Sequence, residues 1–164
     1  MSKKSAIAIL NKQFKELMKN PIDGFFVGLK DDNIFIWEGN LIGPEETLYE
    51  GGIFSFNIFF PENFPLAPPK FIFNTKIYNP NIYKSGEVCI SILHEPGEDV
   101  MGYEDSSERW RPVHTIESIV ISIISLLSNP NDESPANIDA GKLWRENKEE
   151  YKKKVRDCVK LTQN

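Results

Sequence analysis

Apolar and polar positions alternate along this 164-residue chain in two different rhythms, and the change of rhythm separates expected helices from expected strands. Over residues 3–19 the apolar side chains recur every three or four positions, which is typical of an amphipathic helix with one buried face. These positions are Ile7, Leu10, Phe14 and Leu17. The pattern ends at Asn20-Pro21, because proline cannot continue a helix.

Short segments rich in β-branched and aromatic residues follow, and residues that favour turns separate them. The segments cover residues 24–29, 34–42, 53–60 and 70–73. The first three are separated by Asp31-Asp32-Asn33, Gly43-Pro44 and Gly51-Gly52. Because the spacing between segments is typical of hairpins, we expect an antiparallel meander of about four strands.

Two stretches of the chain have neither rhythm. Residues 61–69 carry four prolines, which cannot serve a central strand or a helix interior. Residues 74–114 also lack clear periodicity. Loops of that length in a compact domain are usually functional, so we expect the chemistry of the protein to lie there.

Helical spacing resumes at Thr115, a residue type that caps the start of helices well. Apolar residues then cover much of the circumference, so we expect the central helix here, with Ile116, Ile119, Val120, Ile123, Ile124 and Leu127 buried. Two more helices are expected over residues 139–146 and 148–162. Helices segregated from an antiparallel sheet predict the α+β class, with residues 1–164 in a single domain.

The composition limits the class of protein further. The chain is 40% hydrophobic and 26% charged, an ordinary globular balance. The longest apolar run, residues 119–127, is too short for a membrane span, and Met1-Ser2-Lys3-Lys4 adjoins no apolar core of the signal-peptide type. The two cysteines make no disulfide framework, and no His/Cys cluster has metal-ligand spacing. We therefore expect a soluble, intracellular, metal-free protein.

The formal net charge of −5 argues against a general nucleic-acid binder, and the distribution of charge says more than its sum. Residues 1–20 and the C-terminal segment are basic, whereas residues 94–109 are strongly acidic. The acidic side chains of this block are Glu95, Glu98, Asp99, Glu104, Asp105 and Glu108.

The main candidate for chemistry is Cys89, in the long irregular stretch. A cysteine thiolate is the strongest nucleophile available to a protein near neutral pH. Asn81, eight residues earlier, carries an amide that can donate to a developing oxyanion or pin a loop. Spacing alone leaves a catalytic and a structural role for Cys89 about equally open, whereas the helical spacing of Cys158 on an apolar face favours a structural thiol.

The segment Asn79-Pro80-Asn81 followed by Cys89 resembles the active-site loop of ubiquitin-conjugating enzymes, whose usual signature is His-Pro-Asn before the catalytic cysteine. Other matching motifs stand in the same order at Trp37-Glu38, Gly43-Pro44, 47–52, 64–70, 89–93, and Trp110 with Pro112. The stretch 94–109 resembles the acidic loop insertion of some members, and segments 131–137 and 154–159 are most similar to the G-type. The departure is Asn79, whose amide can supply a donor of similar reach to the usual histidine.

This resemblance implies the fold of ubiquitin-conjugating enzymes and a reaction of two acyl transfers. Cys89 would accept the C-terminal carboxyl of ubiquitin as a thioester from an activating enzyme. A lysine amine would then attack the thioester, usually with a ubiquitin ligase bound, and polyubiquitin chains would result. ATP is used by the activating enzyme upstream, so no cofactor is implied for this chain.

The remaining site positions of the family fall on Asn81 (oxyanion or loop support), Tyr83 (surroundings of the acceptor lysine), Asn79 and Pro80 (loop support) and Ser134 (gate position). Many members carry aspartate at the gate, and a serine cannot act as an anionic base. The resemblance therefore leaves the removal of the amine proton to other groups, and Asp132 and Glu133 are neighbours that can compensate.

Partner surfaces are also implied by the resemblance. Lys12 and Lys15 on the first helix would meet the activating enzyme and ligases. Leu66 would form an apolar ligase surface together with Pro135 and Ala136 on a neighbouring loop. We expect the acidic block to act on chain building, and a cytoplasmic or nuclear location that also allows association with a membrane-bound ligase.

Two other classes of function compete with this interpretation. A catalytically weak variant could serve as a binding module for ubiquitin or a ligase, and Asn79 is the one feature that favours it. A cysteine hydrolase would need a base beside Cys89, and the two histidines, His94 and His114, stand in no protease signature. We therefore do not expect a Cys-His pair.

Overall fold

The computed structural model describes residues 2–95 and 109–163. In these residues the elements are α1 (Lys3–Lys19), β1 (Phe25–Lys30), β2 (Asn33–Ile42), β3 (Ile53–Phe59), β4 (Lys70–Phe73), the 3-10 helix η1 (Ser91–Leu93), α2 (Ile116–Ser128), α3 (Ile138–Glu146) and α4 (Lys148–Thr162). Every expected helix and strand is present, and no end differs from its expected position by more than one residue. Only η1 was not predicted, because three residues are too few to show a period.

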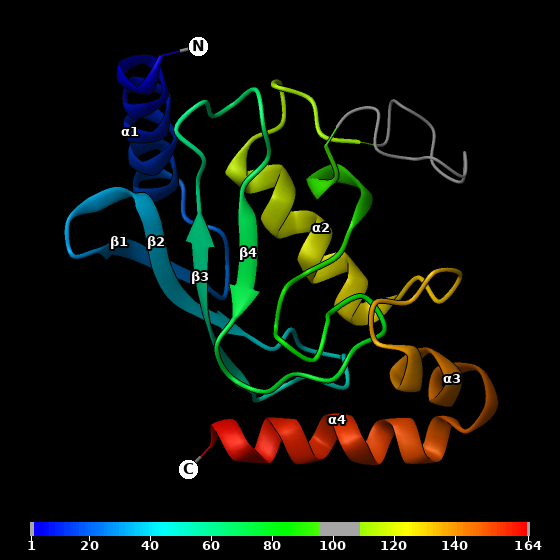
Figure 1. Ribbon diagram of the computed structural model, residues 1–164. Helices are drawn as coiled ribbons and strands as arrows, with labels where there is room; N and C mark the ends of the chain where they lie inside the picture. The colour runs from blue at the N-terminus through cyan, green and yellow to red at the C-terminus, as the bar shows by residue number, and fades with distance from the viewer. Residues whose placement is uncertain (1, 96–108, 164) are drawn as a thin grey trace.

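The strands form one antiparallel sheet in the order β1-β2-β3-β4, which confirms the predicted meander (Figure 1). Trp37 of β2 lies opposite Leu29 of β1 on one side and Ile58 of β3 on the other. β4 is the edge strand that precedes the long loop carrying Cys89. The loop with the candidate site therefore begins at a strand that is hydrogen-bonded into the sheet.

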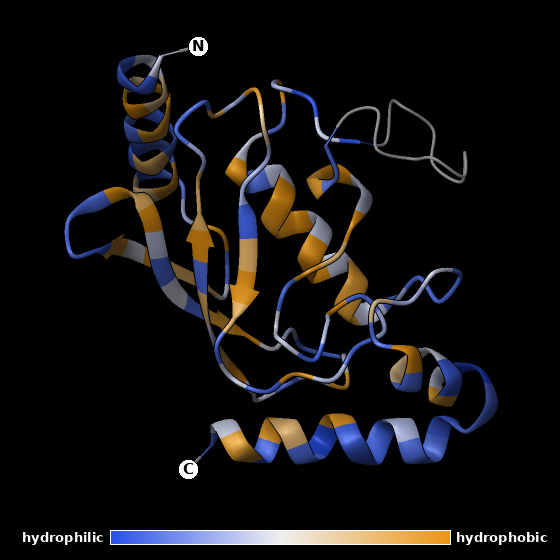
Figure 2. Ribbon diagram, viewed as in Figure 1, coloured by the Kyte–Doolittle hydropathy of each residue, from blue (hydrophilic) through white to orange (hydrophobic). Residues whose placement is uncertain are grey.

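The hydrophobic core joins the inner face of the sheet to the apolar side of α2. On β3 the buried side chains Phe54, Phe56 and Ile58 are two residues apart, as expected for one face of a strand. The apolar side chains of α2 belong to the same cluster, and Figure 2 shows α2 as the most hydrophobic helix. Burial of each such side chain stabilises the fold by about 1.5–3 kcal/mol. Because its apolar side chains belong to this core, α2 is the central helix that was expected.

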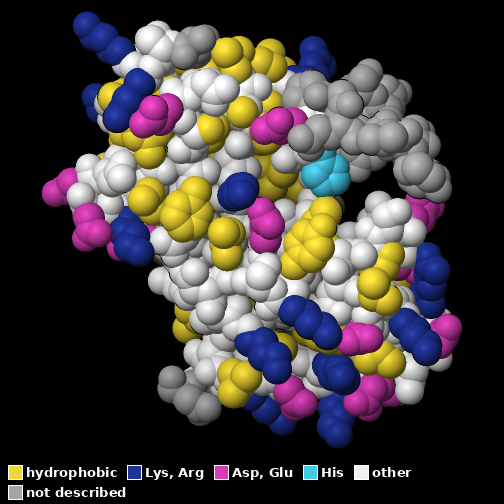
Figure 3. Space-filling model, in the orientation of Figure 1, with side chains coloured by type: hydrophobic (Ala, Val, Ile, Leu, Met, Phe, Trp, Pro, Cys, Tyr) yellow, Lys and Arg dark blue, Asp and Glu magenta, His cyan; other side chains and the backbone are white. Residues whose placement is uncertain are grey.

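The outer helices close the two ends of this core. α1 packs against β2, where the rings of Phe14 and Trp37 meet edge-on with centroids 5.1 Å apart. α4 crosses the opposite end in Figure 1, and the Thr162 hydroxyl accepts a hydrogen bond from the Ile53 backbone N–H (2.9 Å). Lysine and arginine side chains gather over α4 in Figure 3, in agreement with the basic C-terminal segment. The expected α+β arrangement of helices around an antiparallel sheet is thereby confirmed.

Across residues 2–95 and 109–163, no helix is long and apolar enough to cross a membrane. In the same residues no group of three or more His, Cys, Asp or Glu side chains could hold a metal ion.

Candidate active site

The loop after β4 is fixed by short backbone bridges, although it has no periodicity. Residue pairs Ile72–Glu87 and Ile82–Val88 form isolated antiparallel bridges. The Gly86 backbone passes so close to Phe73 that a Cβ at residue 86 would lie 2.0 Å from the Phe73 carbonyl oxygen, and φ there is +97°. Glycine is therefore needed for this turn, which brings the chain back toward β4 just before Cys89.

Asn79 lies at the centre of a buried polar network. Its side-chain Nδ2 donates to the Tyr49 hydroxyl (3.0 Å) and more weakly to the Leu126 carbonyl (3.4 Å). Its Oδ1 accepts from the Asn81 backbone N–H (2.8 Å). The Tyr49 hydroxyl also donates to the Tyr78 carbonyl and contacts the Tyr151 hydroxyl at 3.2 Å. The amide of Asn79 thus ties the start of the loop to α2 and, through Tyr49, to α4.

Pro80 and Asn81 fix a second loop, residues 131–137, against the first. The Pro80 carbonyl accepts from the backbone N–H groups of Ala136 (2.8 Å) and Asn137 (3.1 Å). The Asn81 side chain makes two bonds to the backbone of Asn131, donating from Nδ2 at 2.7 Å and accepting on Oδ1 at 2.8 Å. This arrangement is the loop support that was one of the two expected roles of Asn81.

The Asn81 backbone also holds the cysteine itself. The Cys89 N–H donates to the Asn81 carbonyl (2.8 Å), so any movement of the Asn81 backbone is passed directly to Cys89. The half-buried Cys89 thiol opens into a pocket of about 340 Å³, whereas the Cys158 thiol is buried on α4. Burial raises the pKa of Cys158, so that this thiol is a poor source of thiolate, in agreement with the structural role expected for it.

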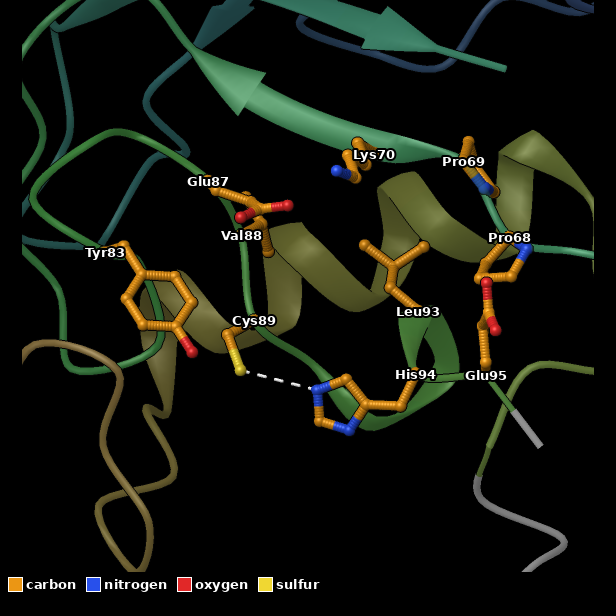
Figure 4. A pocket seen from close by; sticks show the side chains of 10 residues that line it. All are labelled: Pro68, Pro69, Lys70, Tyr83, Glu87, Val88, Cys89, Leu93, His94 and Glu95. Atoms are coloured by element: carbon orange, nitrogen blue, oxygen red, sulfur yellow. Dashed lines mark hydrogen bonds between the residues drawn. The ribbon is translucent and has the colours of Figure 1, made fainter. Parts of the chain in front are cut away.

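Figure 4 shows the pocket around Cys89, with the side chains of Tyr83 and His94 on either side of the sulfur. Cys89 Sγ and His94 Nε2 are 3.4 Å apart, within hydrogen-bond distance for sulfur. The expectation that no Cys-His pair would form is therefore wrong. No local pattern in the sequence indicates this pair, because it depends on the turn η1 between the two residues.

The Tyr83 side chain is exposed beside Cys89. Its pKa is raised above the ordinary value, first by the negative charge that Cys89 can carry and then by a hydrogen bond to the sulfur. The phenol therefore stays protonated near neutral pH and can act as a donor next to the sulfur.

The gate residue Ser134 is exposed in the 131–137 loop. Its neighbour Asp132 does not supply the free carboxylate that was considered as a replacement base. Arg145 donates from Nε to the Asp132 carboxylate (2.7 Å) and from Nη2 to the Asp132 carbonyl (2.6 Å). The hydrogen bond and charge of Arg145 lower the pKa of Asp132, which makes it a weaker base. Glu133 is exposed in the same loop.

The ends of the acidic block meet at the edge of the pocket. The backbone N–H of Trp110 donates to the His94 carbonyl (3.0 Å), and Arg109 Nη1 donates to the Glu95 carbonyl (2.8 Å). Glu95 lines the Cys89 pocket. The other expected acidic residues, Glu98, Asp99, Glu104, Asp105 and Glu108, lie outside the described residues.

The expected ligase surface is wrong in one respect. Leu66 is 47% exposed, but Pro135 and Ala136 are not on a neighbouring loop. The Trp110 indole donates to the Pro65 carbonyl (2.7 Å), which holds the proline-rich loop beside the segment preceding α2.

Residues 131–137 follow the opposite end of α2, which at 13 residues is about 20 Å long (Figure 1). Val113, 71% exposed before α2, is the apolar residue that sequence reasoning missed. Lys12 and Lys15 are exposed on α1, as expected.

Comparison with known proteins places these features in a wider set. The family model described as "Ubiquitin-conjugating enzyme" matches residues 9–159. "Ubiquitin-conjugating enzyme E2 14" of Arabidopsis thaliana is 55% identical over 164 residues, covering 99% of this chain and 98% of the relative. "Ubiquitin-conjugating enzyme E2 15" of Schizosaccharomyces pombe is 61% identical over 153 residues, covering 93% of this chain and 92% of the relative. "Ubiquitin-conjugating enzyme E2 G2" of Homo sapiens is 46% identical over 156 residues, covering 94% of each chain.

Proposed function

We propose, because this chain belongs to the ubiquitin-conjugating enzyme family and is close to its G-type members, that Cys89 is the residue on which it carries ubiquitin. The reaction class is a cysteine-thioester transfer of ubiquitin. The single observation that carries the assignment is the accessible Cys89 thiol in its pocket, in contrast to the buried Cys158 thiol on an apolar helix face. We further propose that residues 1–164 form one catalytic domain.

In the loading step the Cys89 thiolate attacks the carbonyl carbon of ubiquitin on the activating enzyme, whose own cysteine leaves. In the second step a lysine amine attacks the new thioester, and the Cys89 sulfur leaves. A thioester is already activated, so neither step requires a metal ion or a catalytic triad. The work left to the protein is to position the amine, help remove its proton and stabilise the oxyanion.

In this proposal Asn81 serves the second step by positioning Cys89 and the 131–137 loop. Its side chain is engaged with the Asn131 backbone, and its carbonyl holds the N–H of Cys89. Loss of the side chain would free the 131–137 loop, which borders the route of the incoming lysine beside Tyr83. Tyr83 contributes an exposed ring that excludes water from the amine, which favours its neutral, nucleophilic form.

The binding surfaces follow from the exposed residues. We propose that ligases contact Leu66 and Val113, which lie on the two loops joined by the Trp110–Pro65 bond. Both side chains are apolar and exposed, as suits a small transient interface. Lys12 and Lys15 remain the proposed contacts to the activating enzyme. The acidic block is proposed to steer a ligase or an acceptor ubiquitin during chain building, in the cytoplasm or nucleus or at a membrane-bound ligase.

A binding module without catalysis is not favoured, since the relatives that match most of the chain are named as conjugating enzymes. The discriminating experiment is an incubation of the full chain with ubiquitin, activating enzyme and ATP. We expect a ubiquitin-sized adduct that reducing agent removes. Cys89→Ala should abolish it, Cys89→Ser should give an adduct that resists reducing agent, and the matched control Cys158→Ala should load normally. An adduct that persists in Cys89→Ala would refute the assignment.

A further inference from the structure

The proposed lysine transfer relies on an activated thioester and a desolvated amine, and it assigns no role to the contact between Cys89 and His94. His94 follows η1, and its ring nitrogen Nε2 lies 3.4 Å from the Cys89 sulfur. In Figure 4 a ring nitrogen of His94 faces the Cys89 sulfur, and a dashed line joins the two atoms. A histidine in this position is within reach of any nucleophile that attacks a carbonyl carbon bonded to that sulfur.

Among the residues that the structure describes, several carboxylates near the site are less suited to take a proton there. Asp132 is held by Arg145, and Asp139 is held by Lys84 at 3.0 Å, so the pKa of each is lowered by the hydrogen bond of its partner. The carboxylates of Glu87 and Glu95 also line the pocket, but in Figure 4 neither is directed at the Cys89 sulfur. The gate position carries Ser134, which has no charge.

A general base matters more for some nucleophiles than for others. A neutral lysine amine already presents a lone pair and loses its extra proton after attack. A hydroxyl group is a poor nucleophile until its proton is accepted during the attack, as in the Ser-His pairs of hydrolases. A base beside a thioester therefore extends the range of acceptors rather than merely the rate.

We propose that His94 is a general base that allows the Cys89 thioester to acylate hydroxyl groups of serine or threonine side chains, in addition to lysine amines. The inference rests on the proposed thioester at Cys89. The acceptor oxygen attacks the thioester carbonyl carbon while its proton passes to His94 Nε2. The tetrahedral intermediate collapses, the carbon–sulfur bond breaks, and the proton on Nε2 passes to the leaving Cys89 sulfur. The products are an ester and a free thiol, with no oxidant or reductant involved.

The test uses three N-acetylated peptides that are identical except for a central serine, lysine or alanine. The full chain is loaded with fluorescent ubiquitin, the ATP is removed, and each peptide is added. We expect the serine peptide to form a product that resists brief treatment with reducing agent but is cleaved by hydroxylamine. The lysine product should resist both reagents, and the alanine peptide reports hydrolysis by water.

The variant His94→Gln keeps a polar side chain of similar reach but cannot carry the proton. It should load normally and lower transfer to serine about 10²-fold, the usual contribution of a general base, with less than about a threefold change for lysine. The matched control is His114→Gln, which removes the other histidine of the chain and should behave as the parent does.

Three results would overturn the inference: no hydroxylamine-sensitive product from the parent enzyme, equal serine transfer in His94→Gln, or an equal loss for serine and lysine in that variant. The last result would assign His94 a role in shaping the pocket. Failure of the proposed function itself would be distinct, because the parent would then not load or would not discharge to lysine.

Discussion

Loss of the hydroxyl group should change the free energy of unfolding differently at two tyrosines of one cluster. The Tyr49 hydroxyl is buried with three partners, namely Asn79 Nδ2, the Tyr78 carbonyl and the Tyr151 hydroxyl. The Tyr78 hydroxyl is also buried but has no hydrogen-bond partner in the described part of the chain. The pair Tyr49→Phe and Tyr78→Phe therefore removes the same atom from opposite settings.

The magnitude follows from the groups left without a partner. In Tyr49→Phe the Tyr78 carbonyl and the Tyr151 hydroxyl lose this bond, while Asn79 Nδ2 keeps only its longer bond to the Leu126 carbonyl. Each buried polar group left unsatisfied costs about 1–3 kcal/mol, so we expect the free energy of unfolding to fall by roughly 2–4 kcal/mol. Tyr78→Phe removes a buried group that is already unsatisfied, so we expect no loss, or a gain of up to about 1 kcal/mol.

Equilibrium unfolding in urea, followed by tryptophan fluorescence, measures both changes, provided that the slope against denaturant is the same in each variant. Burial raises the pKa of Tyr49 well above its usual range and that of Tyr151 to about 12, so both phenols stay protonated and the result should not depend on pH between 6 and 9. Equal losses in the two variants, or a Tyr49→Phe protein within about 0.5 kcal/mol of the parent, would refute the reasoning.

Four further predictions concern the loops around the site. Asn81→Ala should load with ubiquitin but discharge to free lysine about 10²-fold more slowly, the usual cost of a small misplacement, as measured in single turnovers, and equal discharge rates would contradict the role given to this side chain. Asn79→His should fold and retain discharge, and a collapse seen by circular dichroism would mean that the loop is adapted to the amide. Replacing residues 94–109 with a short Gly/Ser connector should leave loading intact but reduce the formation of polyubiquitin chains. High salt should weaken chain formation by the parent and so narrow the difference between the two proteins. An equal fall in loading and in chain formation would mean that the segment has a structural role. Arg145 lowers the pKa of Asp132 in the folded protein, so their pairing stabilises the fold above the ordinary carboxyl pKa and is lost as the pH falls through the lowered pKa. Arg145→Gln should therefore make the free energy of unfolding less dependent on pH below about pH 4. An unchanged dependence on pH would exclude a contribution from this pair.

The fold could be predicted from the sequence where the signal is local. α2 and α4 carry long apolar stripes, and the strands are bounded by turn residues, so both appear within one residue of their expected ends. Thr115 was expected as the cap of α2, and its side chain accepts from the Ser118 N–H. These features need no knowledge of distant residues.

The site could be predicted only in part, because its decisive contacts join residues far apart in the chain. Cys89 and Asn81 were identified from their own loop, but the partner of the Asn81 side chain is Asn131, fifty residues away. His94 was dismissed as a partner of Cys89 because it stands in no protease signature, whereas its approach depends on η1, which has no sequence period. Val113 was missed because the loop beside Leu66 was assigned to the wrong end of α2.

The amide at residue 79 also fixes how the enzyme responds to its surroundings. A carboxamide neither gains nor loses a proton at physiological pH, whereas an imidazole in the same place changes charge near neutrality. The bonds from Asn79 to Tyr49 and to the Asn81 backbone therefore keep the same donors and acceptors in acidified and alkaline compartments alike. The framework beneath the cysteine therefore keeps its hydrogen bonds over this range, and any response of the enzyme to pH near neutrality arises from other groups.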